Sequence, residues 1–114
     1  EDANDPNHKP LKDNWERLKR GFDEKGSKWD LVKLPMPGKV ADGGMRLPAS
    51  YANFYIANEV VLLPTYEHRN DDRAKKILQE FFSEREIVTI PCRSLVYGLG
   101  ALHCVTQQEP SLAK

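Results

Sequence analysis

The sequence predicts an α/β fold, and three observations support this. Apolar residues recur at helical spacing in two stretches, residues 11–22 and 74–82. Short runs that alternate apolar and polar residues, or are rich in β-branched ones, lie between and after them and are typical of strands. From residue 51 onward the predicted order is strand, strand, helix, strand, so one ββαβ unit follows the end of an αβ unit.

The first 46 residues are predicted to hold a helix, a strand and a long loop. Residues 1–10 are polar and are expected to form a loop. A helix follows up to about Gly26, with one apolar face that we expect to pack in a core: Leu11, Trp15, Leu18 and Phe22. Residues 29–34 alternate and are expected to form a strand. Residues 36–48 form a loop that either covers a site or only connects two elements.

The remaining residues are predicted to supply the ββαβ unit. Residues 51–58 and 59–63 are strand-like and are expected to pair as a hairpin. Asn70-Asp71-Asp72 offers N-cap side chains for a helix that runs to residue 82. Residues 85–90 form the next strand, and residues 94–97 are expected to form a short helical turn.

The composition excludes several classes of partner. Lys and Arg total 17, as do Asp and Glu, so no basic excess is available for a nucleic-acid backbone. No apolar run approaches the roughly 20 residues that a membrane-spanning helix needs. Two cysteines are too few for a disulfide framework, which favours a reducing compartment, and we expect a cytoplasmic protein. The three histidines are scattered, so no metal site is expected.

The stretch from Gly98 to Pro110 carries the candidate functional residues. Gly98 and Gly100 precede a short apolar run that contains Cys104, and residues 102–106 are expected to form the last strand. Glycine lets the backbone approach another group closely, so a cysteine after such a passage can lie at the mouth of a site. The alternative from the residues alone is a buried strand in which Cys104 is an inert, small apolar residue.

This stretch resembles the C-terminal signature of the agmatine deiminase family. Its residues are Gly-Leu-Gly-Ala-Leu-His-Cys-Val-Thr-Gln-Gln-Glu-Pro. That family is related to the bacterial-type peptidylarginine deiminases. Residues 47–58, and residues 60–64 followed by Asn70-Asp71-Asp72, resemble the same family in the same order. The resemblance extends from about residue 2 to residue 110.

The resemblance implies a five-bladed α/β propeller, the pentein fold, of which this chain is the C-terminal portion. Residues 1–46 would be the end of the penultimate αβ unit with its connecting loop, and residues 47–114 the last ββαβ unit. A complete propeller needs a much longer chain, and this one begins at Glu1 without a methionine. We therefore expect a C-terminal fragment of the enzyme.

The resemblance also implies that Cys104 is the catalytic nucleophile. A thiolate is a strong nucleophile of modest basicity, which suits the weakly electrophilic carbon of a guanidinium. It would form a covalent amidino-thioether and release ammonia, and water would then release the carbamoyl product, which for agmatine is N-carbamoylputrescine. Gly98 and Gly100 would shape the backbone of the substrate site. No metal or organic cofactor is implied.

His103 is expected to face away from the site and to make a structural hydrogen bond, because neighbours on a strand point to opposite faces. The resemblance implies that the acid/base histidine, its aspartate and the carboxylates that grip the guanidinium lie upstream of this chain. The chain alone should therefore be inactive.

The stretch departs from the usual family form at two positions. Leu99 and Ala101 stand where the family often has Gly and Asn, which bears on the backbone beside Cys104 and on the choice of guanidine. Leu99 would be awkward at a position that requires a positive φ.

Three functions remain open on the sequence. The first is agmatine deiminase, the second is a deiminase of peptidyl or free arginine, and the third is a catalytically inactive domain that only packs or assembles. The intact sequence around Cys104 speaks against the third. The expected partners are a small guanidine substrate, the remaining N-terminal part of the enzyme and, as one possibility, a second copy in a homodimer. No nucleic-acid or membrane partner is expected.

Overall fold

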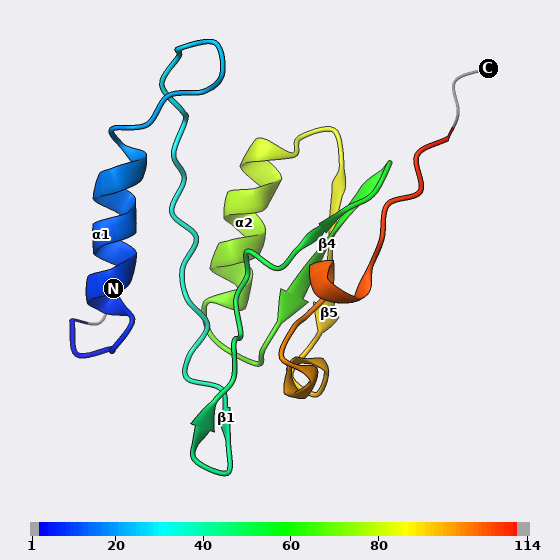
Figure 1. The fold of residues 1–114 in the computed structure, drawn as a ribbon. Coiled ribbons are helices and arrows are strands. Elements are labelled where there is room, and N and C mark those ends of the chain that lie inside the picture. The colour runs from blue at the N-terminus through cyan, green and yellow to red at the C-terminus, as the bar shows by residue number, and fades with distance from the viewer. Residues whose placement is uncertain (1–2, 112–114) are drawn as a thin grey trace. The chain divides into compact units, whose positions relative to one another are not determined.

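The computed structural model describes residues 3–111 and is shown in Figure 1. The chain forms two compact units, one up to Lys33 and one from Leu34. The boundary expected at residue 46 concerns repeats of a complete propeller and stays a prediction. No helix in the described residues is long and apolar enough to cross a membrane.

The first unit consists of helix α1 (His8–Leu18) and an irregular segment. The helix begins inside the stretch expected to be a loop and ends well before Gly26. Gly26, at φ 79°, instead belongs to a turn in which the Asp23 carboxylate accepts bonds from the amides of Lys25 and Ser27. Residues 1 and 2 of the predicted loop lie outside the described residues.

Two predictions for the first unit are wrong. No residue of α1 is buried, and Leu11 and Leu18 are 47% and 42% exposed, so the apolar stripe does not pack in a core of this chain. Trp15 is half-buried, with the Lys33 ammonium 4.4 Å from its ring centroid. Residues 29–34 form no strand, because alternation gives a strand only where a neighbouring strand is available to pair with it.

The second unit contains the predicted ββαβ order. Strands β3 (Tyr55–Ile56), β4 (Val60–Thr65) and β5 (Glu86–Pro91) form one sheet in the order β3-β4-β5. Strands β3 and β4 pair antiparallel as the predicted hairpin, although β3 is much shorter than expected. Helix α2 (Asp71–Phe81) connects β4 to its parallel neighbour β5. A helical crossover is the usual way to join adjacent parallel strands.

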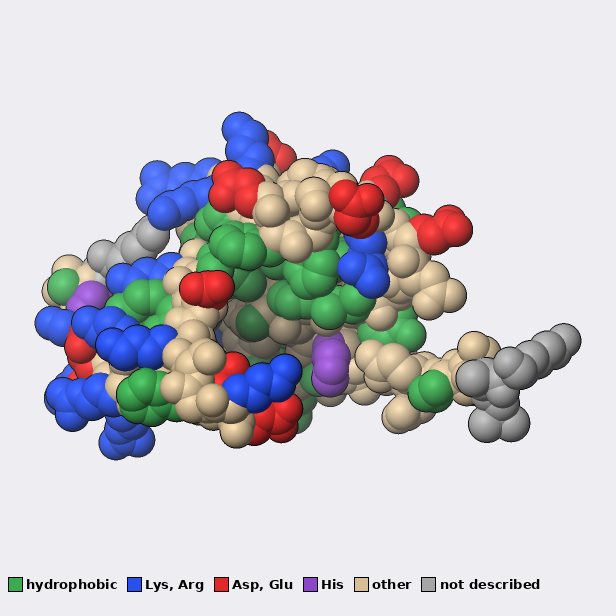
Figure 2. All heavy atoms as spheres, turned by 90° about the horizontal axis from the view of Figure 1, so that it is seen from above, with side chains coloured by type: hydrophobic (Ala, Val, Ile, Leu, Met, Phe, Trp, Pro, Cys, Tyr) green, Lys and Arg blue, Asp and Glu red, His purple; other side chains and the backbone are tan. Residues whose placement is uncertain are grey.

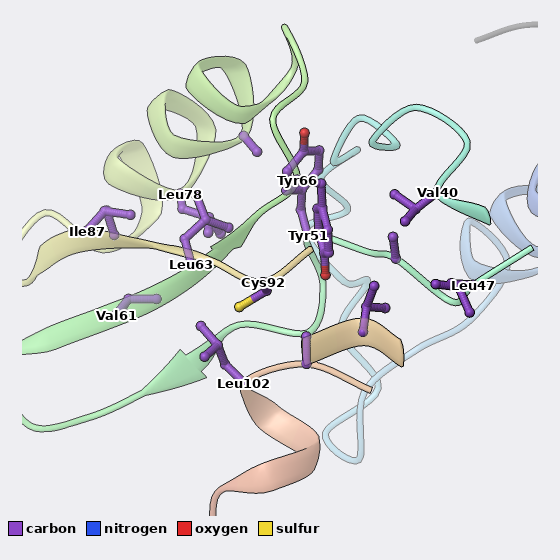
Figure 3. Packing of buried hydrophobic residues seen from close by; sticks show 14 residues of the cluster. Val40, Leu47, Tyr51, Val61, Leu63, Tyr66, Leu78, Ile87, Cys92 and Leu102 are labelled. Atoms are coloured by element: carbon purple, nitrogen blue, oxygen red, sulfur yellow. The ribbon is translucent and has the colours of Figure 1, made fainter. Parts of the chain in front are cut away.

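The core lies between α2 and the sheet (Figure 3). It continues to Tyr51, in the loop that leads to β3, and to Val40 and Leu47. Val61 and Leu63 of β4 are fully buried, and Ala74 and Leu78 of α2 face them at the i, i+4 spacing of one helix face. The rings of Tyr51 and Tyr66 pack against each other with their centroids 5.8 Å apart. These contacts give the second unit a continuous apolar interior.

The loop expected over residues 36–48 is more ordered than predicted. It contains a small hairpin of β1 (Ala41–Asp42) and β2 (Met45–Arg46). Gly43 and Gly44 connect the two strands with φ of 51° and 84°, the pair of positive values that favours a tight hairpin turn.

The last part of the chain forms two short 3₁₀ helices. The first, η1 (Leu95–Gly98), confirms the predicted helical turn. The second, η2 (His103–Val105), occupies the place of the predicted last strand, so that prediction is wrong. A local bond favours the turn, because the Thr106 hydroxyl donates to the carbonyl of Leu102 over 2.7 Å.

Candidate active site

The candidate nucleophile Cys104 is exposed and lies within the turn η2. Leu102, directly before the turn, is buried and points into the core (Figure 3). The Thr106 hydroxyl closes the other end of the turn through its bond to the Leu102 carbonyl. A buried residue before it and a side-chain bond after it therefore fix the turn that presents the thiol.

Asn53 contacts this turn from a distant part of the sequence. Its side-chain oxygen accepts hydrogen bonds from the backbone amides of His103 at 2.8 Å and Cys104 at 3.3 Å. Its side-chain nitrogen lies 3.0 Å from the Cys104 sulfur, to which it donates. One amide group thus binds both the backbone and the thiol of the candidate nucleophile.

Asn53 ends a short turn that is tied to the core by Tyr66. The Asn53 amide donates to the carbonyl of Ser50 at 3.2 Å. The Tyr66 hydroxyl donates to the same carbonyl at 3.2 Å and accepts from the Ser50 amide at 3.3 Å. The backbone that carries Asn53 is therefore fastened to a buried side chain of the sheet unit.

Tyr51, inside the same turn, binds Asp71 at the start of α2. Its hydroxyl donates to the Asp71 carboxylate at 2.6 Å, and the same carboxylate accepts the backbone amides of Tyr66 and His68. Burial, together with the bond to Asp71, raises the pKa of Tyr51 far above its usual range. The Asp71 carboxylate thus binds both the turn that contains Tyr51 and the loop that precedes α2.

The N-cap residue of α2 behaves differently from the prediction. Asn70 occupies the N-cap position, but its side chain makes no capping bond. The Asn70 side chain instead donates to the carbonyl of Met36 at 2.8 Å, which holds the loop before β1. Asp71 and Asp72 place negative charge in the first helical turn, where the helix dipole favours it.

The two candidate glycines have different surroundings. Gly100 is buried, and a Cβ there would lie 2.6 Å from the Cys104 Cβ and 2.9 Å from its sulfur. Only glycine leaves room for Cys104 at that position. Gly98 is exposed, and a Cβ there would meet nothing within 4 Å. Leu99 between them adopts φ 64°, the left-handed conformation that the sequence analysis identified as awkward for leucine.

The side chain of His103 lies at the surface rather than behind the site. His103 is exposed and lines an open cavity of about 290 Å³ together with Ser50, Ala52 and Asn53. The argument that placed it on the opposite face assumed a strand, and the turn η2 removes that assumption. The backbone amide of His103 donates to Asn53 twice, to the side-chain oxygen and to the backbone carbonyl.

The other cysteine, Cys92, has a structural position. It is fully buried beyond the end of β5, and this burial raises the pKa of its thiol. Cys92 and Cys104 are both free. Within residues 3–111, no group of three or more His, Cys, Asp or Glu residues is placed to hold a metal ion.

Exposed apolar side chains lie close to Cys104 in the sequence of the second unit. Tyr97, Leu99 and Val105 are all more than half exposed. Figure 2 shows apolar side chains gathered on one face of the molecule among charged ones. Exposed apolar surface of this kind is typical of a region that another part of a protein covers.

The sequence analysis missed the role of Asn53. The residue belongs to the stretch 47–58 that carried part of the family resemblance, but it had no assigned role. Its separation of about fifty residues from Cys104 gives no local signal. The polar asparagine in an otherwise aromatic segment, Tyr-Ala-Asn-Phe-Tyr, was the available hint.

Comparisons with known proteins agree on one group of enzymes. The family model described as Porphyromonas-type peptidyl-arginine deiminase matches residues 1–110. A curated protein of Marinomonas sp. (strain MWYL1), assigned as an agmatine deiminase, is 37% identical over an alignment that covers 96% of this chain and 34% of that protein. This chain thus spans about a third of the length of the curated relatives it matches.

Solved structures give the same result. A protein of Porphyromonas gingivalis, assigned as an arginine deiminase, superposes with a TM-score of 0.93 at 44% identity, over 96% of this chain and 32% of that one. The agmatine deiminase of Enterococcus faecalis superposes with a TM-score of 0.89 at 32% identity, over 96% of this chain and 35% of that one.

Proposed function

This chain belongs to the family of Porphyromonas-type peptidyl-arginine deiminases, and we propose that it forms the cysteine-bearing part of an enzyme that hydrolyses agmatine. The observation that carries the proposal is the site at Cys104. An exposed thiol is held on a fixed turn, bound by an asparagine, and packed against a glycine that leaves room only for it. The agmatine deiminases among the relatives favour agmatine as the substrate.

The proposed reaction has two halves. The Cys104 thiolate attacks the guanidinium carbon, and the tetrahedral adduct expels one amino group as ammonia once that group has received a proton. This leaves an amidino-thioether on the sulfur. Water then adds to the same carbon, the C–S bond breaks, and the sulfur leaves as a thiolate. The sum is agmatine plus water giving N-carbamoylputrescine plus ammonia, with no change in oxidation state.

The rest of the site is proposed to come from polypeptide beyond this chain. The cavity beside His103 is open, and the side chains of Tyr97, Leu99 and Val105, close to Cys104 in sequence, are exposed. We infer that the larger part of the enzyme covers this surface and supplies the acid/base histidine and the carboxylates for the guanidinium. In that arrangement this chain contributes the last blade, and the end of the one before it, to a five-bladed propeller.

The test is a pair of cysteine variants in the complete enzyme. Cys104→Ser should reduce ammonia release from agmatine by on the order of a thousandfold or more, because the hydroxyl is a far weaker nucleophile here. Cys92→Ser is the matched control and should retain most of the activity, since Cys92 is buried away from the surface. A Cys104→Ser enzyme with nearly full activity would contradict the proposal.

A second candidate substrate is arginine, either free or in a peptide. The family name and the assignment of the Porphyromonas gingivalis structure favour it. Ammonia release measured side by side on agmatine, arginine and an arginine-containing peptide separates the two, because agmatine lacks the carboxyl group that arginine carries. A higher kcat/KM for either arginine substrate would replace agmatine in the proposal.

A further inference from the structure

We propose that Asn53 holds Cys104 in its reactive state, with its amide nitrogen donating to the thiolate and its amide oxygen fixing the backbone that carries the sulfur. The inference rests on the proposed role of Cys104 as the nucleophile and adds a residue that stabilises that nucleophile before the substrate arrives. Asn53 would then be a contact of the reacting sulfur itself.

The orientation of the amide follows from its neighbours. An asparagine amide can be turned over without changing its shape, so its two ends must be assigned from their partners. The backbone amides of His103 and Cys104 can only donate, and both point at one end of the Asn53 side chain. That end must be the oxygen. The other end, 3.0 Å from the sulfur, is therefore the nitrogen.

An N–H group aimed at sulfur favours the ionised form. The amide nitrogen of asparagine only donates, and a hydrogen bond to a charged acceptor is roughly twice as strong as one to a neutral acceptor. The bond is accordingly stronger when Cys104 is a thiolate than when it is a thiol, so it stabilises the charged form. The attacking species of the proposed reaction is that thiolate.

Neighbouring hydrogen bonds also fix the geometry of the contact between Asn53 and the Cys104 sulfur. The backbone amide of Asn53 donates to the Ser50 carbonyl. The hydroxyl of the buried Tyr66 binds the backbone of Ser50 as well. The amides of His103 and Cys104 are held by the same side chain that reaches the sulfur. The distance between donor and sulfur is thus set by two anchored turns rather than by a mobile side chain, as a preorganised site requires.

The experiment compares Asn53→Asp with the intact complete enzyme. The carboxylate keeps an oxygen for the two backbone amides but places negative charge where the N–H faced the sulfur. We expect the pH midpoint for alkylation of Cys104 by iodoacetamide, followed by mass spectrometry of its peptide, to rise by at least about one unit. The rate near pH 7 should fall about tenfold, and the pH profile of kcat/KM should shift in the same direction.

Two further variants isolate the effect. Asn58→Asp adds the same charge at an exposed asparagine of the turn between β3 and β4, and it should leave the alkylation profile unchanged. Asn53→Ala removes the donor without adding charge and should shift the midpoint upward by less than Asn53→Asp. If Asn53→Asp fails to fold, as judged by its thermal transition, Asn53→Ala still decides the question.

The outcomes separate this inference from the proposed function. Unchanged alkylation profiles in both Asn53 variants, with Cys104→Ser inactive, would overturn the role of Asn53 and leave the nucleophile in place. Full activity of Cys104→Ser would overturn the proposed function, while the alkylation profiles would still report whether Asn53 stabilises the thiolate.

Discussion

At the scale of single residues, Gly100 and Gly98 allow a controlled test of how the site is shaped. Gly100→Ala would bring a Cβ to within 2.6 Å of the Cys104 Cβ, so the turn must move. We expect the activity of the complete enzyme to fall at least about tenfold, with an overpacking cost of roughly 1–3 kcal/mol in the free energy of unfolding. Assays of ammonia release and urea unfolding measure the two effects.

Gly98→Ala is the matched control for that substitution. A Cβ at residue 98 meets nothing within 4 Å, and its φ lies outside the left-handed region. Activity should therefore stay close to that of the unaltered enzyme. Equal activities of the two alanine variants would show that Gly100 does not shape the site.

The backbone conformation of Leu99 shows how far the properties of single residues could be predicted from the sequence. The sequence alone raised the question of a positive φ at this position, because glycine is common there in the family. The structure confirms φ 64°. The left-handed conformation costs a non-glycine residue roughly 1–2 kcal/mol, so the bonds and contacts around Cys104 must outweigh that strain.

At the scale of elements, Tyr51 joins the turn of Asn53 to the start of α2. Its pKa is raised, so the folded protein keeps the phenol proton at a pH where the unfolded chain has lost it. The unfolded state then binds fewer protons, and stability falls as pH rises above about 10. Below that pH the contribution of Tyr51 is fully present.

Tyr51→Phe should therefore have two effects in the complete enzyme. At pH 7 it loses a hydrogen bond to a carboxylate, which is worth roughly 1.5–3 kcal/mol. Above pH 10 its stability should decline less steeply than that of the unaltered protein, by up to about 1.4 kcal/mol per pH unit. Urea midpoints between pH 7 and 11 test this, and parallel decline of both proteins would contradict it.

The elements also show which structural signals are local. The order β3-β4-α2-β5 could be predicted because helical spacing and β-branched runs are written in neighbouring residues. The turn η2 could not be, since Leu102-His103-Cys104-Val105 suits a strand equally well. The deciding contacts are the bond from Thr106 and the amide of Asn53, and the second comes from a residue far away in sequence.

At the scale of the whole molecule, the described residues leave apolar side chains exposed in both units. The stripe on α1 has the spacing of a buried face, yet none of its helix residues is buried. In the second unit, the apolar side chains of Leu99 and Val105, close to Cys104 in sequence, are exposed. The apolar spacing thus predicted which face of α1 is apolar, but within the described residues that face is not buried.

The 114 residues on their own should lack deiminase activity. We expect no release of ammonia from agmatine above the blank, because the cavity beside the turn of Cys104 is lined by Ser50, Ala52, Asn53 and His103 and holds no carboxylate for the guanidinium. The uncovered apolar faces should also bind a hydrophobic dye such as ANS more strongly than the complete enzyme does. Circular dichroism checks that the chain is folded in the assay. Measurable turnover by the folded chain would mean that its own residues complete the site.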